Sequence, residues 1–393
     1  MQDVFVLSAV RTPIGKYGGG LASVPPCDLA AKVVREAVSR SGADPDQVGH
    51  SVFGNVIHTE VRDMYLARVA ALNGGLPVGT PALTVNRLCG SGLQAIVSAS
   101  QAIMLGDCEV AVAGGAESMS RAPYWLPGMR WGQRMGDGMA IDPMVGALSD
   151  PFDACHMGVT AENVATDYHV SRADQDALAA ESHRRAAAAT AAGYFKEQIL
   201  PVEIPGKKGS TTVVDTDEHI RPDVRPADMA KLKPAFAKDG TVTAGNASGI
   251  NDAAAAVVLA SGSFVSRNGY SPMARLVGYA HAGVQPRIMG IGPVPATQKV
   301  LDRTGIKLDE IDFFEVNEAF AAQALAVVRE LDLPPERTNP NGSGISLGHP
   351  VGATGAILTV KSMYELRRTG GRYALVTMCI GGGQGIAAIF ERV

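Results

Sequence analysis

Reactive chemistry in this chain centres on Cys89, in the stretch RLCGSG (residues 87–92). A β-type run at 82–85 leads into it, and a helical run at 93–105 follows. A cysteine at such a turn lies among free backbone N–H groups and at the positive end of a helix dipole, and both favour the thiolate. The flanking glycines would let a substrate carbonyl approach the backbone closely. The same pattern also fits a buried cysteine in a tight turn.

Three segments far along the chain carry groups that could act with this cysteine. They are NEAF (317–320), GHPVGATG (348–355) and CIGGGQG (379–385). A histidine can take a proton from a thiol, and a second cysteine of tuned pKa can move protons. Each segment also has a plain structural interpretation. The asparagine could cap a helix, the histidine could lie at the surface, and Cys379 could be a small core residue.

Length and composition limit the class of protein. A chain of 393 residues is too long for one ordinary core, so two or three domains are expected. The net charge of −4, with both signs interspersed, predicts no binding to nucleic acid or to an anionic membrane. Five scattered cysteines without a CxxC pair argue against disulfides and a metal site and favour a reducing cytoplasm. No signal peptide or apolar stretch of about 20 residues is evident.

Strands and helices alternate in the first and last thirds of the sequence. Strands or buried apolar runs are expected at residues 4–9, 51–57, 82–85, 110–113, 253–260, 274–280, 312–316, 373–379 and 385–390. Helices are expected at 28–40 (capped by Asp28), 63–72, 93–105, 160–168, 172–192 (capped by Ser171), 294–304, 318–331 and 353–368. Such alternation predicts parallel sheets covered by helices.

Residues 119–249 interrupt this alternation. They are rich in methionine, proline, glycine and charge, and they predict an inserted loop domain of the kind that usually carries function. The lysine pair at 207–208 is expected in a solvated turn. We therefore divide the chain into an N-terminal half, 1–118 completed by 250–270, the insertion, and a C-terminal half, 271–393.

The two alternating regions are similar to each other. SGADPDQV (41–48) parallels TGIKLDEI (304–311), and each leads into a strand that ends in asparagine. Repetition of one unit predicts two similar halves related by a pseudo-twofold axis. Corresponding loops would meet at that axis, which would bring Cys89 close to His349 and Cys379.

Taken together, these segments resemble the signature set of the thiolases, the acetyl-CoA acetyltransferases. The resemblance extends to SAVRTPIG (8–15), GGAESMS (114–120), HMGVTAENVA (156–165) and GNASGIND (245–252), so it covers nearly the whole chain in family order. The chain is most similar to the bacterial biosynthetic type, above all the broad-chain-length β-ketothiolases of polyhydroxyalkanoate synthesis.

The resemblance implies the α/β thiolase fold. Two similar βαβαβαββ halves would form a five-layer αβαβα core, with the inserted loop domain beside it. We expect each half to hold a mainly parallel five-stranded sheet. The helices that follow Cys89 and Gly352 would lie buried between the two sheets, because both are rich in small residues.

The resemblance also implies a reaction. Acetyl-CoA would condense reversibly with a short acyl-CoA, or a 3-ketoacyl-CoA would be cleaved by thiolysis, in a ping-pong scheme. Cys89 would become the acyl-enzyme, with His349 as its base, and Cys379 would act as acid and base at the α-carbon. His349 and a water on Asn317 would hold the enolate oxygen. The backbone N–H groups of Cys89 and Gly381 would hold the thioester oxygen.

Coenzyme A, free or acylated, is the implied partner, as a substrate and not as a permanent cofactor. Its expected contacts are His156, Met157, Leu148, Arg221, Ala244, Ser248, Met289, Ala319 and Phe320. For Leu148, Met289 and Phe320, ordinary core packing is an equally good interpretation. The resemblance further implies a homotetramer, a dimer of dimers, with residues 123–138 as the tetramer contact.

Other activities differ in what they need from these residues. A β-ketoacyl-acyl-carrier-protein synthase pairs its reactive cysteine with two histidines, or with histidine and asparagine, where this chain offers Cys379. A cysteine hydrolase has no need of the second cysteine turn. A non-catalytic acyl-CoA or lipid carrier on the same fold would not need Cys89, His349, Asn317 and Cys379 together.

Overall fold

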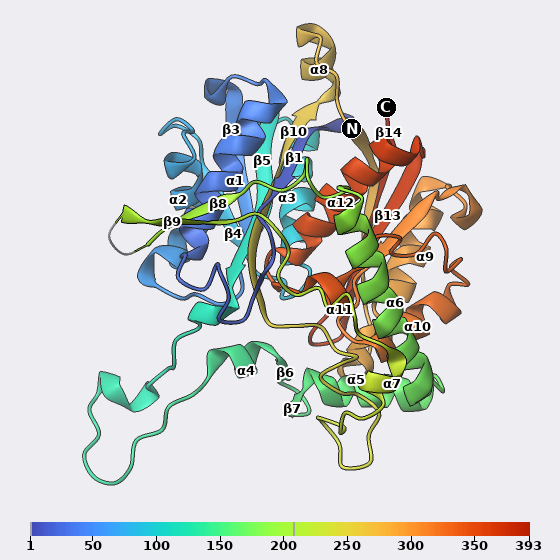
Figure 1. Ribbon diagram of the computed structural model, residues 1–393. Helices are drawn as coiled ribbons and strands as arrows, with labels where there is room; N and C mark the ends of the chain where they lie inside the picture. Colours follow the sequence, from blue (N-terminus) through green and yellow to red (C-terminus); the bar gives the residue numbers. More distant parts are fainter. Residues whose placement is uncertain (1, 207–208) are drawn as a thin grey trace.

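The computed structural model describes residues 2–206 and 209–393; the lysine pair expected in a solvated turn, Lys207 and Lys208, lies outside them. Figure 1 shows the N-terminal part of the chain (blue to cyan) beside the C-terminal part (orange to red), with the two termini close together. The green and yellow segment between them covers one side of both parts.

The N-terminal half is built on five strands in the order β1 (Val4–Arg11), β10 (Asn251–Ser261), β5 (Val110–Ser118), β3 (Val48–Gly54) and β4 (Ala82–Val85). The pairs β5–β3 and β3–β4 are parallel, whereas β10 runs antiparallel to both of its neighbours. The apolar run expected at 253–260 is therefore a central strand that joins the half from beyond the insertion.

The C-terminal half contributes β12 (Phe313–Val316), β13 (Tyr373–Ile380), β14 (Gln384–Arg392) and β11 (Ala274–Gly283), in that order. Only the pair β12–β13 is parallel among these described strands. A single parallel bridge from Phe314 to Thr338 extends this side of the sheet. Strand β11 also pairs with β1, so the two halves share one continuous sheet.

The expectation of mainly parallel sheets is wrong. Three residues, 381–383, join β13 to β14, and a connection this short can only reverse the chain. Two of its glycines take left-handed backbone conformations, with φ of 79° at Gly382 and 85° at Gly383. The expected parallel direction holds for β3, β4, β5, β12 and β13, whereas β1, β10, β11 and β14 are present where strands or apolar runs were expected but pair antiparallel.

The expected helices are present, with ends that differ by a few residues. The helices are α1 (Pro26–Ser41), α2 (Leu66–Asn73), α3 (Ser91–Leu105), α4 (Pro143–Ala147), α5 (Met157–Asp167), α6 (Arg172–Ala191), α7 (Pro226–Met229), α8 (Gly262–Asn268), α9 (Pro293–Thr304), α10 (Ala321–Glu330), α11 (Gly344–Leu347) and α12 (Thr354–Thr369). The short strands are β2 (Gly15–Lys16), β6 (Ser149–Asp150), β7 (Cys155–His156), β8 (Val202–Pro205) and β9 (Thr211–Val214). Ser171 caps α6 as expected. Asp28 is no cap, because α1 starts two residues earlier, at a proline whose fixed φ suits the first turn.

Helices α3 and α12 pack against each other in the core, and their expected burial is confirmed. They approach so closely that a Cβ at Gly355 would lie 2.3 Å from the backbone N of Leu93. Reciprocally, a Cβ at Gly92 would lie 2.6 Å from the backbone N of Ala356. Residues 88–105 are apolar enough to span a membrane, with a mean hydropathy of 1.3, but 56% of them are buried within the fold.

This contact gives a test of the fold. The substitution Gly355→Ala should push the helices apart and cost about 1–3 kcal/mol of stability, because a backbone atom cannot move aside as a side chain can. Thermal unfolding measures the loss as a lower melting temperature. Gly79→Ala is the control, since a Cβ there meets open space. Equal melting temperatures for the two variants would contradict the described helix contact.

Candidate active site

A cavity of about 750 Å³ lies between the insertion and the two halves. Cys89, His349 and Gly381 line its inner end, and they come from three of the four segments singled out in the sequence. The nine expected coenzyme A contacts also line it, namely His156, Met157, Leu148, Arg221, Ala244, Ser248, Met289, Ala319 and Phe320. Asn317 and Cys379 are not among the described lining residues, and both are buried.

The turn that carries Cys89 is strained and held from both sides. Leu88 takes a left-handed conformation, with φ of 44°, which costs a residue with a side chain about 1–3 kcal/mol. The hydroxyl of Ser91 accepts from the backbone N of Arg87 at 2.8 Å and donates to the carbonyl of Leu88 at 2.7 Å. The side chain of Asn86 accepts from the backbone N of Leu88 at 2.9 Å. These bonds hold the backbone of the turn on both sides of Cys89.

Burial decides the protonation of Cys89. Hydrogen bonds from the backbone N–H groups of Gly381 and of Cys89 itself lower the pKa of the thiol, but burial outweighs them and raises it to about 11. The carboxylate of Glu117 adds a smaller raising effect. The resting thiol is therefore protonated at neutral pH. Burial therefore outweighs the effects of the turn that favour the thiolate, and the site needs a base.

His349 has the form that a base requires. Its Nδ1 lies 2.6 Å from the hydroxyl of Thr354, and that hydroxyl donates its only hydrogen to the carbonyl of Pro350 at 2.9 Å. Nδ1 must then carry the proton and donate it, which leaves Nε2 as the acceptor. Burial lowers the pKa of His349 to about 4, so the ring is neutral at pH 7. The backbone N of His349 also donates to Asn251 at 2.9 Å.

Asn317 lies at the end of β12 with its Nδ2 3.4 Å from Nε2 of His349. Its Oδ1 is buried and accepts no hydrogen bond from any described residue. The alternative that Asn317 caps the next helix does not hold, because α10 starts at Ala321 and its cap position is Phe320. A buried carbonyl oxygen without a partner marks a polar position beside the histidine.

Cys379 lies behind the wall of the cavity. It packs with Met157, Met289 and Phe320, whose side chains face the cavity. Burial and the neighbouring Cys89 both raise the pKa of its thiol well above the usual range. The two sulfurs are therefore neighbours, but only that of Cys89 belongs to the described lining.

Several residues of the site were not expected from the sequence. Phe236 stacks on His156 with ring centroids 4.7 Å apart and meets Phe320 edge-on at 6.2 Å. Nothing in its local sequence distinguishes it from an ordinary loop residue. Thr354 lies within the GHPVGATG segment, five residues after the histidine, and that spacing was a usable signal.

Glu117 was also missed as part of the site. Its carboxylate accepts from the backbone N of Gly352 at 2.9 Å, and from the backbone N of Val56 and of Ile57 at 3.1 Å each. Burial raises its pKa to about 8 against the lowering effect of these bonds. Glu117 thereby joins a loop of the N-terminal half to the turn that carries His349.

Comparison with known proteins identifies the family. The model of the thiolase N-terminal domain matches residues 4–263, and that of the thiolase C-terminal domain matches residues 270–392. The chain belongs to the thiolase family. It is 64% identical to the β-ketothiolase BktB of Cupriavidus necator over 393 residues, which are 100% of both chains. It is 48% identical to an acetyl-CoA acetyltransferase of Chromobacterium violaceum, again over 100% of both.

Solved structures agree with this assignment. The acetyl-CoA acetyltransferase of Bacillus anthracis superposes with a TM-score of 0.98 at 46% identity, covering 100% of this thiolase and 99% of that chain. Human mitochondrial 3-ketoacyl-CoA thiolase in complex with CoA superposes with a TM-score of 0.96 at 46% identity, covering 100% of this thiolase and 98% of that chain. The thiolase fold expected from the sequence is confirmed.

The protonation of Cys89 can be measured directly. With a pKa of about 11 and no substrate present, alkylation by iodoacetamide should rise about tenfold per pH unit between pH 7 and 9, because only the thiolate reacts. Mass spectrometry of the peptide that contains Cys89 separates it from Cys108 and Cys155, which are partly exposed. A rate that levels off below pH 8 would show a stabilised thiolate instead.

Proposed function

We propose that this thiolase is an acetyl-CoA C-acyltransferase that joins acetyl-CoA to a short acyl-CoA, or cleaves a 3-ketoacyl-CoA with CoA. The observation that carries the proposal is the arrangement at the inner end of the cavity. The thiol of Cys89, a backbone N–H that bonds to its sulfur, and His349 lie together where an acyl thioester could reach them. The names of its relatives, β-ketothiolase and acetyl-CoA acetyltransferase, support the same reaction.

In the first half-reaction Cys89 attacks the thioester carbonyl of acetyl-CoA. Its proton passes to Nε2 of His349, the only ring nitrogen free to accept it. The C–S bond to CoA then breaks, the departing CoA thiolate takes the proton of Cys379, and acetyl-Cys89 remains with His349 still protonated at Nε2. The backbone N–H groups of Cys89 and Gly381 hold the oxyanion, and such a donor is worth about 3 kcal/mol of barrier.

In the second half-reaction another thioester enters and Cys379, now a thiolate, takes a proton from its α-carbon. The Nε2–H of protonated His349 and a water on the free Oδ1 of Asn317 hold the enolate oxygen. The carbanion attacks the acyl-enzyme, a C–C bond forms, and Cys89 leaves as a thiolate that takes back its proton from His349. In the direction of thiolysis Cys379 starts as a thiol and returns its proton to the departing carbanion, which agrees with its raised pKa.

Coenzyme A is the proposed partner and enters as a substrate without permanent binding. Arg221 is exposed at the cavity and would contact the adenine nucleotide. Ala244, Ser248 and the methionines of the wall would contact the pantetheine arm, for which flexible thioethers are good neighbours. The human relative named above was solved with CoA, which supports this choice of ligand.

We also propose the division into halves 1–118 with 250–270 and 271–393, around the insertion 119–249. The protein would work in the cytoplasm, where its five free cysteines stay reduced. The insertion carries a projecting arm that is visible in Figure 1. Its exposed apolar side chains are Tyr124, Trp125, Leu126, Met129, Trp131, Met135 and Met139. Exposed patches of this kind mark interaction sites, and we assign this one to the homotetramer.

The activity is tested by thiolysis. The purified protein should cleave 3-ketoacyl-CoAs in the presence of CoA, and a series of increasing chain length should favour short chains. Cys89→Ser should lower kcat at least about a thousandfold, since it removes the acyl carrier. Cys379→Ser should still form acetyl-Cys89, seen by mass spectrometry, but should not condense it.

The rivals predict other results in the same assays. Activity with acyl-carrier-protein donors only would indicate a ketoacyl synthase, and hydrolysis without CoA would indicate a cysteine hydrolase. Binding of acetyl-CoA without release of CoA would indicate a carrier. Each of these outcomes contradicts the proposed thiolase reaction.

The assembly is tested by light scattering. The double substitution Trp131→Glu and Met135→Glu places charge on the arm and should shift the mass from a tetramer towards a dimer. Leu105→Glu, at an equally exposed apolar position at the end of α3, is the control and should leave the mass unchanged. A tetramer that survives the double substitution would exclude the arm as the contact.

A further inference from the structure

We propose that Lys361 is a positioning residue that sets the distance between Asn317 and His349. It would do so by holding two segments against the buried helix α12. One is strand β12, which leads into Asn317, and the other is the neighbouring loop at residues 338–344. The inference rests on the proposed function, because it concerns the oxyanion hole for the enolate.

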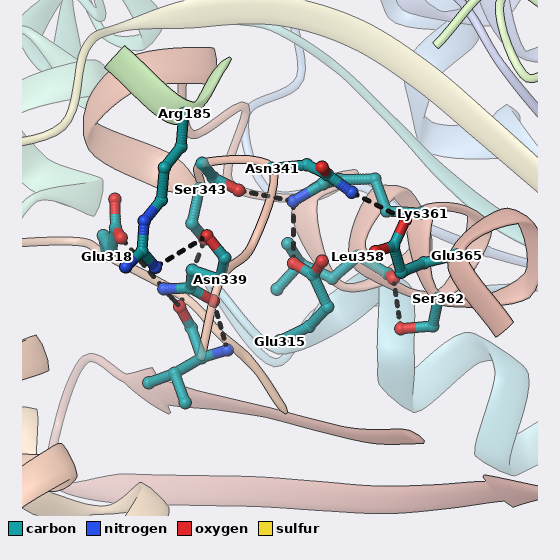
Figure 2. A network of polar contacts seen from close by, with 12 residues as sticks. Arg185, Glu315, Glu318, Asn339, Asn341, Ser343, Leu358, Lys361, Ser362 and Glu365 are labelled. Carbon is teal, nitrogen blue, oxygen red and sulfur yellow. Dashed lines mark hydrogen bonds and ion pairs between the residues drawn. The ribbon is translucent and has the colours of Figure 1, made fainter. Parts of the chain in front are cut away.

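Lys361 is buried within α12, with 2% of its surface exposed. Figure 2 shows that its ammonium group reaches two different segments of the chain. It forms an ion pair with the carboxylate of Glu315 at 2.7 Å and donates to the carbonyl of Gly342 at 2.6 Å. One side chain therefore holds strand β12 and the loop at residues 338–344 at the same time.

Both of these segments lead directly to Asn317. Glu315 precedes it by two residues on β12, so the two side chains leave the same face of the strand. In the loop, the side chain of Asn339 accepts from the backbone N of Val316 at 2.9 Å and donates to its carbonyl at 2.8 Å. The same amide donates to Glu318 at 2.9 Å. The loop thus holds the residues on both sides of Asn317.

The loop also limits the Asn317 side chain sterically. A Cβ at Gly344 would lie 2.9 Å from its Oδ1 and 2.6 Å from the carbonyl of Glu318. The backbone at Gly344 therefore packs directly against the side-chain amide of Asn317, and a shift of the loop must move Asn317. Lys361 anchors this loop to α12 together with Asn341, whose amide donates to Glu365 at 2.9 Å, but of the two only Lys361 also holds β12.

His349 is anchored at the first residue of α12, two turns before Lys361, and at the start of β10. Its ring bonds to Thr354 and its backbone N bonds to Asn251, neither of which contacts Lys361 through a described hydrogen bond. Loss of Lys361 would thus move Asn317 relative to a fixed histidine. Their separation of 3.4 Å is already near the limit for a hydrogen bond, so a small displacement is enough to lose the pair.

The core does not need the buried ion pair of Lys361 and Glu315 for its packing. Oε1 of Glu315 has no hydrogen-bond partner among the described residues, so this ion pair is incompletely satisfied. Apolar side chains of similar volume often replace such a pair without loss of stability. A role in geometry explains why a lysine and a glutamate occupy this place.

The experiment compares two isotope exchanges with acetyl-CoA as the probe. Exchange of its methyl protons with D2O reports the enolate, and exchange of label between CoA and acetyl-CoA reports acyl transfer to Cys89. The first test variant is Lys361→Met. The second is the double variant Glu315→Leu with Lys361→Met. It leaves neither charge of the pair buried without a partner, so it serves if the single variant does not fold.

Two controls separate positioning from stability. Glu315→Gln keeps an acceptor for Lys361 and keeps the bond to Gly342. Met363→Ala opens a cavity in α12 two residues further on, at a side chain that is 1% exposed, and lowers stability without touching the loop.

We expect the ratio of enolate exchange to acyl exchange to fall about 10- to 100-fold in both test variants, the loss that a misplacement of about 1 Å causes. Glu315→Gln and Met363→Ala should keep the wild-type ratio. An unchanged ratio in the double variant, or an equal fall of the ratio in Met363→Ala, would overturn this inference and leave the proposed function standing. Absence of both exchanges in the wild type would overturn the proposed function and the inference with it.

Discussion

The close approach of helices α3 and α12 is the constraint on which the rest of the structure depends. Their first turns meet at Gly92 and Gly355, with backbone against backbone. Cys89 lies just before one helix and His349 just before the other, so the contact that packs the core also brings the two reactive side chains together. Each half supplies one helix, and neither half could build the site alone.

The protonation states of the site follow from the burial of the first turns of α3 and α12. Burial at the place where the helices begin raises the pKa of both thiols and lowers that of His349. The site therefore rests as neutral groups, a thiol beside an imidazole whose free nitrogen is fixed by Thr354. In the proposed reaction charge would develop only when a substrate is present, close to the backbone N–H groups of Gly381 and Cys89 that bond to the sulfur.

The sequence predicted which residues would form the site better than it predicted their protonation states. Cys89, His349 and Cys379 were named because their segments together resemble the thiolase signature set, and the structure brings Cys89 and His349 to one cavity with Cys379 behind its wall. The pKa of Cys89 could not be predicted, because it depends on depth below the surface. Phe236 could not be found, since a loop aromatic becomes part of a wall only when the loop folds over the cavity.

The fold was predictable in its order of elements and less so in its strand directions. Alternation of strand and helix is visible along a chain, but the reversal between β13 and β14 depends on two glycines with left-handed backbone. The pairing of β1 with β11 joins distant segments over only three residues and leaves no local signal. Asp28 failed as a cap for a local reason, because the helix already starts at Pro26.

The shared sheet has a mechanical consequence. Strands β1 and β11 join the halves at one place, and α3 and α12 join them at another. Rotating one half against the other would break both joints at once, so the halves have no hinge between them. The cavity is therefore bounded on two sides by parts that are fixed to each other, and a change in its width would have to come from the residues of the insertion that line it.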